Sequence, residues 1–243
     1  MNPPQLAVQP AEPAAAPPGT AGTPAARPLV REDLAHGSAR SLYLRSQLGD
    51  HAWTEAQIER SLAQTLAGAP AGDLWLFAYG SLIWNPLFDV AEERVARVHG
   101  LHRSFCLWSL IGRGSVAQPG LVLGLERGGA CRGVALRVAR HHAHDELRLV
   151  WRREMLSGGY RPTWIRACTP QGVVAAIAFV VNRSARHYAG RLADDEVVRV
   201  VRSAAGLNGS CMEYLAQTQA GLAARGIFDR RLQRLARRCG CGA

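Results

Sequence analysis

The central part of the chain consists of short runs rich in β-branched and aromatic residues, each bounded by glycine, proline or charged residues. The first run, residues 74–79, is continuously apolar and stops at Gly80, a pattern typical of a buried strand that enters a sharp turn. Later runs of this kind cover residues 94–98, 104–110, 121–126, 131–138, 163–168 and 173–181. The runs predict a sheet or barrel in the middle of the chain.

Helical patterns precede and follow these runs. Residues 54–57 have the spacing of a capping box, and apolar residues follow at helical intervals until Gly68. Further helical patterns cover residues 144–155, 194–205 and 210–225, and the last begins with a second capping box at residues 210–213. Strands that are followed by interleaved and terminal helices predict an α+β domain.

At 243 residues with 48% hydrophobic content, the chain is long enough for one globular core and an extension. Residues 1–30 are rich in proline and alanine, so we expect a disordered leader that does not shape a binding pocket. We expect a helical extension over residues 31–72, a catalytic domain over residues 73–238 and a tail over residues 239–243. No secretory signal pattern or membrane-spanning apolar stretch is found in the sequence, which favours a cytoplasmic protein.

The formal charge of +10 raises the question of nucleic-acid binding. All 29 basic residues are arginine, and alanine is also abundant, so the charge is better explained by compositional bias than by a binding face. A basic surface would still attract small anionic substrates. A role in binding RNA through the arginine-rich segment 225–238 is kept as the alternative from another functional class.

Neither the cysteines nor the histidines form a clear metal site. The six cysteines are too sparse for a disulfide-stapled domain and are expected to be free thiols, with metal binding by Cys239 and Cys241 the weaker reading. His141, His142 and His144 precede a predicted helix in a charged segment and lack partners at zinc-ligand spacing. We therefore expect surface histidines and no metal.

Glu154 lies on the apolar face of the predicted helix 144–155, three residues after Trp151 and four after Val150. A carboxylate that faces the core needs a partner, or its pKa rises toward neutrality, as suits a general base. An ion pair with Arg153 or Arg161 is the structural alternative, and the pattern alone does not separate the two.

The turn after the first strand is the second candidate site. A strand that ends in Gly80-Ser81 can leave its next backbone N–H groups unpaired and convergent, as a carboxylate or an oxyanion requires. A tight turn here favours a positive φ at Gly80. Ser81 lacks the G-x-S-x-G context of a hydrolase nucleophile, which disfavours a serine hydrolase. Most such turns are structural only.

The glycine pair at residues 158–159 ends the predicted helix just before Tyr160. Paired glycines permit a left-handed C-cap and close approach of the backbone to a ligand. On its own, the segment is a helix stop.

Taken together, these segments resemble the ChaC-like family, in order and over residues 74–236. The matching motifs are YGSLIWNP (79–86), HGLHRSFCLWS (99–109), PGLVL (119–123), CRGVA (131–135), REM (153–155), GYRP (159–162), YAGRL (188–192) and GSCMEYL (209–215). Eukaryotic members often have Asn-Thr-Glu-Tyr-Leu where this chain has Cys211-Met212-Glu213-Tyr214-Leu215, so a ligand contact of that asparagine is not carried over.

The family consists of glutathione-specific γ-glutamylcyclotransferases. The resemblance implies a small mixed β-barrel flanked by helices, no metal or organic cofactor, glutathione as the partner and no membrane partner. It also implies that Glu154 is catalytic and that the turn Tyr79, Gly80, Ser81 and Leu82 holds the γ-glutamyl group. Tyr160 lies in the matching GYRP motif, and Tyr214 resembles a substrate-contacting residue.

The implied chemistry agrees with the residues. The substrate's α-amine attacks its own γ-carbonyl, a step that needs the two groups to be oriented and protons to be moved. Glu154 could take the proton from the amine and later deliver one to the departing cysteinylglycine nitrogen. The products would be 5-oxoproline and Cys-Gly. Because the turn and Glu154 would contact only the γ-glutamyl part of glutathione, a cyclotransferase for other γ-glutamyl amines is the nearest alternative.

Overall fold

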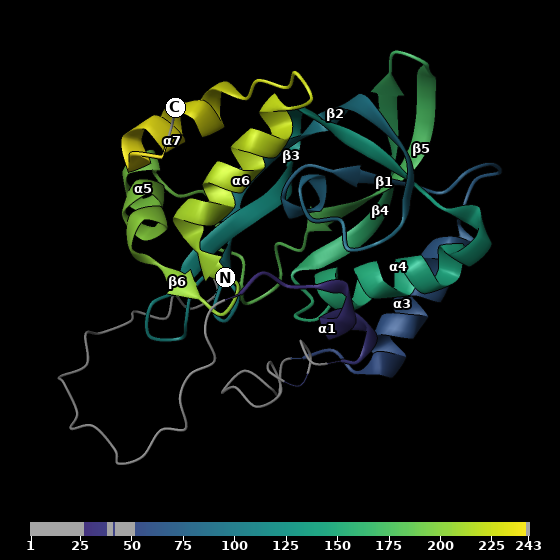
Figure 1. Ribbon diagram of the computed structural model, residues 1–243, viewed down its shortest axis with the longest axis horizontal. Helices are drawn as coiled ribbons and strands as arrows, with labels where there is room; N and C mark the ends of the chain where they lie inside the picture. The colour runs from purple at the N-terminus through teal and green to yellow at the C-terminus, as the bar shows by residue number, and fades with distance from the viewer. Residues whose placement is uncertain (1–26, 38–40, 42–51, 242–243) are drawn as a thin grey trace, which may run out of the picture.

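The computed structural model describes residues 27–37, 41 and 52–241. In this part of the chain, five strands close into a barrel in the order β1-β3-β2-β4-β5, and β1 pairs in parallel with β5 to complete it (Figure 1). The strands are β1 (Trp75–Ala78), β2 (Val90–Ser109), β3 (Gly120–Val138), β4 (Tyr160–Thr169) and β5 (Gly172–Val181). The predicted α+β class and the small mixed barrel are confirmed.

Strands β2 and β3 are each one long strand where the sequence predicted two runs. The interruption in β2 is Gly100, which adopts a φ of +78° where the register shifts between His99 and Leu101. Gly100 faces both Gly128 and Gly129, so β3 carries the extra residue of a bulge that bends the two strands without ending their pairing. Gly128 and Gly129 in β3 also have positive φ, so the glycines that separated the predicted runs are bends within continuous strands.

The barrel core explains why the first predicted strand is apolar at every position. All four residues of β1 are buried, because one face lines the barrel interior and the other is covered by further elements. Phe77 from β1 and Phe179 from β5 are almost fully buried, and Trp151 packs edge-on against Phe179 with ring centroids 5.1 Å apart.

The longer helices form two groups (Figure 1). Helices α3 (Glu55–Ala67) and α4 (Ala143–Glu154) pack together at one side of the barrel, and α5 (Asp194–Ser203), α6 (Cys211–Ala223) and α7 (Arg230–Cys239) form the other group. The predicted capping boxes are present at Thr54 and Ser210, whose side chains accept from the N–H groups of Gln57 and Glu213. The remaining short elements are η2 (Ser81–Ile83), η3 (Arg140–His142), β6 (Ala205–Gly206) and β7 (Gly209–Ser210).

Helix α7 was not predicted from the sequence. The helix is rich in arginine, but one of its faces is apolar and buried. That face is formed by Leu232, Leu235, Ala236 and Cys239. Arg231 and Arg234 pair with Asp194 at 3.3 and 2.9 Å, and Arg238 pairs with Asp195. The arginine-rich segment is thus a packed helix that is tied to the first turn of α5, and it continues through Cys239 to a C-cap at Gly240.

A short N-terminal segment, residues 27–35, crosses the barrel end and is called the strap below. It contains helix α1 (Arg31–Ala35), and it joins the two helical groups (Figure 1). Arg27 donates its backbone N–H to Leu207 at 3.0 Å, Arg31 pairs with Glu146 of α4 at 2.5 Å, and Leu34 is buried. Residues 1–26 of the predicted leader lie outside the described residues.

The six cysteines are free thiols, as predicted. Across the described ranges, no helix has the length and apolar content needed to cross a bilayer.

Candidate active site

Glu154 is the last residue of α4 and points toward the end of the barrel. The helix is fixed by Trp151, which packs on Phe179 and donates its Nε1–H to Ser61 Oγ at 3.2 Å. The Glu154 side chain is only 12% exposed. Burial raises the pKa of Glu154 above its ordinary value, and the neighbouring Arg153 guanidinium offsets part of that rise.

Arg153 connects the catalytic candidate to the turn after β1. Its Nε lies 3.1 Å from Glu154 Oε1, and its Nη2 donates to Ser81 Oγ at 2.5 Å. Its Nη1 donates to the backbone oxygen of Asn85. Of the two arginines that the sequence offered as partners, the structure pairs Arg153 with Glu154, and Arg161 is exposed. The two interpretations of Glu154, a structural ion pair and a carboxyl with a raised pKa, are therefore both correct, because the carboxyl is ion-paired and its pKa is still raised.

The turn after β1 is a single 3₁₀ turn, η2. Gly80 precedes it with a φ of −135°, so the expected positive φ is wrong. Glycine leaves space here, since a Cβ would lie 3.0 Å from the Tyr214 hydroxyl, a contact tight enough to displace that hydroxyl by a few tenths of an ångström. Ile83 donates its N–H to Gly80 O at 3.0 Å, while the amides of Ser81 and Leu82 come before the first bond of the turn and have no acceptor within it.

Three tyrosines meet beside this turn, of which Tyr79 and Tyr214 are buried and Tyr160 is partly buried. Tyr79 donates to the backbone oxygen of Phe179 at 2.6 Å, and Tyr160 donates to the oxygen of Leu123 at 3.0 Å. The Tyr214 hydroxyl instead accepts from the Leu123 N–H at 3.2 Å, which leaves its own proton available. Burial raises the pKa of all three tyrosines, and the Glu154 carboxylate raises it further, so they act as neutral hydroxyls.

These groups enclose a recess of about 20 Å³ at the end of the barrel, with space for about one water-sized group. It is lined by Tyr79, Gly80, Ser81, Leu82, Leu123, Glu154, Tyr160, Phe179 and Tyr214. All seven site residues named from the sequence are in this lining. The structure therefore brings together segments that lie up to 135 positions apart, counted from Tyr79 to Tyr214.

A larger outer cavity of about 280 Å³ opens from the recess and shares Ser81, Glu154, Tyr160 and Tyr214 with it. The volume is close to the lower end of the range for small-molecule sites. Its other walls come from the end of β2 and the loop that follows, from the end of α4, from residues 207–208 and from the strap. The site thus lies where the two helical groups meet the barrel.

Most of the outer cavity's lining was not named from the sequence, and Leu29, Leu34 and Arg113 are examples. Leu29 lies in residues 1–30, which were expected to be a leader that does not shape a pocket, and Leu34 lies in the predicted helical extension. Arg113 lines the cavity from the loop between β2 and β3. A leucine next to a proline and an arginine between glycines show no periodicity, so only the hydrophobic character of Leu29 and Leu34 could have signalled burial.

The rival chemistries receive no support from the geometry. Ser81 Oγ is hydrogen-bonded to the Arg153 guanidinium, which cannot accept a proton and so cannot activate a serine nucleophile. Among residues 27–37, 41 and 52–241, no group of three or more His, Cys, Asp or Glu side chains could hold a metal ion.

Comparison with solved structures shows to which fold class this barrel belongs. A crystal structure of a γ-glutamyl cyclotransferase specific to glutathione from yeast superposes with a TM-score of 0.65 at 21% identity, covering 70% of this chain and 96% of that one. The fold is therefore that of the γ-glutamylcyclotransferases.

Sequence comparison defines the family. The ChaC-like protein family matches residues 74–239, so the chain belongs to it. A curated relative from Escherichia coli, named glutathione-specific gamma-glutamylcyclotransferase, is 37% identical over 73% of this chain and 78% of its own length. The mouse glutathione-specific gamma-glutamylcyclotransferase 1 is 33% identical over 58% of this chain and 66% of its own length. The predicted family resemblance is confirmed.

Proposed function

We propose that this protein is a glutathione-specific γ-glutamylcyclotransferase that converts glutathione into 5-oxoproline and Cys-Gly. The observation that carries the proposal is a buried carboxyl, Glu154, whose pKa is raised and which shares a narrow recess with the backbone turn at Ser81. Membership of the ChaC-like family and the names of the bacterial and mouse relatives support glutathione as the substrate.

Glu154 is assigned both proton transfers. As the α-nitrogen of the substrate bonds to the γ-carbonyl carbon, it gives up a proton to the Glu154 carboxylate. As the bond from that carbon to the cysteinyl nitrogen breaks, the Glu154 carboxyl returns a proton to the leaving nitrogen. One proton moves from the attacking to the leaving nitrogen, and the enzyme ends in its starting form.

The surroundings of Glu154 suit a group that must both accept and donate. Burial moves its pKa toward the working pH, where both protonation states are accessible. The Arg153 guanidinium opposes this rise, because it stabilises the carboxylate form. Arg153 also holds Ser81, and thus fixes the distance between the acid/base group and the turn.

The γ-glutamyl group is assigned to the recess together with the adjoining inner end of the outer cavity, where the two share Ser81, Glu154, Tyr160 and Tyr214. The unpaired amides at the start of η2, in the Tyr79, Gly80, Ser81 and Leu82 segment, would bind the substrate or the oxyanion that develops on the γ-carbonyl. The Tyr214 hydroxyl has a proton to donate, and Tyr160 forms the opposite wall. Closing a five-membered ring is intramolecular, so holding the chain in the folded-back conformation supplies much of the acceleration.

The rest of the outer cavity is assigned to the Cys-Gly part of the substrate. On this assignment, residues 73–238 form the catalytic domain, and the strap adds a wall to it. A cyclotransferase for other γ-glutamyl amines shares every feature of the recess and differs only in what the outer cavity recognises.

The test is an assay of purified protein with reduced glutathione in the presence of excess EDTA. We expect 5-oxoproline and Cys-Gly in equal amounts, with no response to added zinc, because the proposed chemistry uses only side chains and backbone. Simple γ-glutamyl amino acids, assayed in parallel, separate the two substrate classes. Absence of 5-oxoproline would reject the function, and loss of activity with EDTA that metal restores would reject the mechanism.

A further inference from the structure

Arg113 is a second buried arginine at the site, and the mechanism above does not use it. It lies in the loop between β2 and β3 and is only 8% exposed. Its backbone N–H donates to Ser109 Oγ at 2.9 Å, and its backbone oxygen accepts from Cys211 Sγ at 3.1 Å. Packing around Gly120 is so close that a Cβ would lie 2.1 Å from Arg113 O. The loop is therefore held in one position.

The guanidinium of Arg113 has few partners for a buried cation. Within the described residues, its Nη1 donates to Ser210 O at 3.3 Å and lies 3.9 Å from Glu213 Oε2. The Glu213 side chain is 62% exposed and already accepts from the Ser210 N–H at 2.7 Å. A guanidinium has five N–H donors, so most of those of Arg113 are unused.

An underused buried charge is costly, and a ligand of opposite charge would compensate it. Burial lowers the pKa of Arg113, which reflects the same poor compensation. The other buried cation of the cavity, Arg153, differs in this respect because it is engaged by Glu154, Ser81 and Asn85. Among the arginines that line the outer cavity, Arg113 makes the fewest bonds to the described residues, so its remaining donors can bind an anion.

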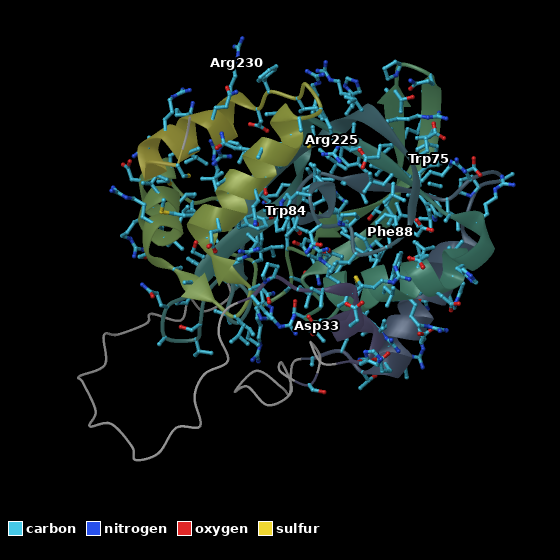
Figure 2. The ribbon with its side chains drawn as sticks, in the orientation of Figure 1. Asp33, Trp75, Trp84, Phe88, Arg225 and Arg230 are labelled. Atoms are coloured by element: carbon cyan, nitrogen blue, oxygen red, sulfur yellow. The ribbon has the colours of Figure 1, made fainter. Side chains whose placement is uncertain are left out.

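The position of Arg113 indicates which part of the substrate it meets. Its guanidinium carbon lies 5.7 Å from the ring centroids of both Trp84 and Tyr214. Figure 2 shows Trp84 in the middle of the molecule beside α6, the helix that carries Tyr214. Arg113 lines the outer cavity and not the recess, so one aromatic ring separates it from the reacting groups.

We propose that Arg113 binds the glycine carboxylate of glutathione and so makes the enzyme selective for the tripeptide over γ-glutamyl amines that lack a distal carboxylate. This inference rests on the proposed function. The α-carboxylate belongs to the γ-glutamyl head and stays beside the recess with it, whereas the glycine carboxylate lies at the far end of the part that extends along the outer cavity. The planar guanidinium suits two-point binding of a carboxylate.

The test compares kcat/KM for glutathione with that for its glycine monoethyl ester, which removes the distal charge and keeps the reacting half. For Arg113→Gln, we expect a loss of about 10²-fold with glutathione and no more than a few-fold change with the ester. Arg113→Lys keeps the charge without the planar fork and should recover part of the loss. Arg152→Gln is the matched control, because Arg152 also lines the cavity but is engaged by Glu55 at 3.2 Å and by the strap. Its ratio of acid to ester should stay at the wild-type value.

Equal losses on the two substrates in Arg113→Gln would overturn the proposal, since they would place Arg113 at the γ-glutamyl end or in a purely structural role. If the wild-type protein released no 5-oxoproline, the proposed function would fail by itself. Calorimetric titration of the wild type and Arg113→Gln with glutathione and with the ester would then decide the inference. Tighter binding of the acid that disappears in the variant supports a carboxylate site, and equal binding of both probes overturns it.

Discussion

Helix α4 carries two glutamates with opposite properties at its two ends. Glu146, in the first turn, accepts two bonds from the Arg31 guanidinium at 2.7 and 2.5 Å and one from the Asp89 N–H at 2.7 Å. The hydrogen bonds from Arg31 hold the pKa of Glu146 below its ordinary value. Glu154, in the last turn, has a single contact with Arg153 at 3.1 Å, and burial raises its pKa.

Both side chains are little exposed, at 5% and 12%, but burial is the largest cause of the pKa shift only at Glu154, whereas at Glu146 the hydrogen bonds from Arg31 outweigh it. The helix dipole adds to the difference, because it favours an anion in the first turn and disfavours one in the last. Glu146 is a permanent anion that anchors the strap to α4. Glu154 is left able to change its protonation state, as an acid/base catalyst must.

The largest expected effect comes from exchanging each glutamate for its neutral isostere. Glu154→Gln should lower kcat for glutathione by about 10²–10⁴-fold, the usual contribution of general acid–base catalysis. Glu146→Gln is the matched control on the same helix and should keep kcat within a few-fold. Steady-state release of 5-oxoproline measures both, and similar losses in the two variants would remove the functional distinction between the ends of α4.

The next effect concerns the space at the recess. Gly80→Val should lower kcat/KM by about 10²-fold, because the new side chain meets the Tyr214 hydroxyl and displaces the groups around Glu154. Gly68→Val is the control, since a Cβ there has only ordinary contacts, the nearest at 3.7 Å. An active Gly80→Val protein would mean that the turn after β1 does not contact the substrate.

The strap is expected to matter less than the recess. Deleting residues 2–26 should leave the kinetics unchanged, whereas deleting residues 2–36 should raise KM by a few-fold with little change in kcat. The longer deletion removes Leu29 and Leu34 from the outer cavity but leaves the recess complete. A large fall in kcat in the longer deletion would contradict this expectation, since it would mean that the strap also positions the catalytic groups.

The smallest effects are on stability, and they should have opposite signs at the two glutamates. The lowered pKa of Glu146 contributes stability above its unfolded pKa, and this is lost as pH falls through the folded value. The raised pKa of Glu154 costs stability once pH exceeds its unfolded pKa. Near neutral pH, Glu146→Gln should therefore lower Tm by several degrees, while Glu154→Gln should leave it unchanged or raise it. Melting curves at pH 4 and pH 8 should show both differences shrinking at the acidic pH.

The sequence predicts the recess better than the outer cavity, for physical reasons. Glu154 follows Trp151 and Val150 at helical spacing, and the turn after β1 follows an apolar strand, so local pattern and family motifs both point to them. Arg113 lies in a loop, and the strap contains only the five-residue helix α1, so the conformation of both depends on contacts with distant residues such as Cys211 and Leu207. The continuity of β2 and β3 was missed for a similar reason, because strand pairing overrides the breaks that Gly100 and Gly128 suggest locally.

The pH dependence of kcat/KM tests the central claim, that Glu154 is a buried acid/base group, most directly. The raised pKa means that activity should fall as pH drops through a midpoint above 4.5, the ordinary value of this carboxyl, because protonation removes the base. Arg153→Met removes the charge that restrains the rise, so its midpoint should move to higher pH, and Glu154→Gln should lose this acidic limb from its residual activity. An acidic limb that persists unchanged in Glu154→Gln would contradict the account.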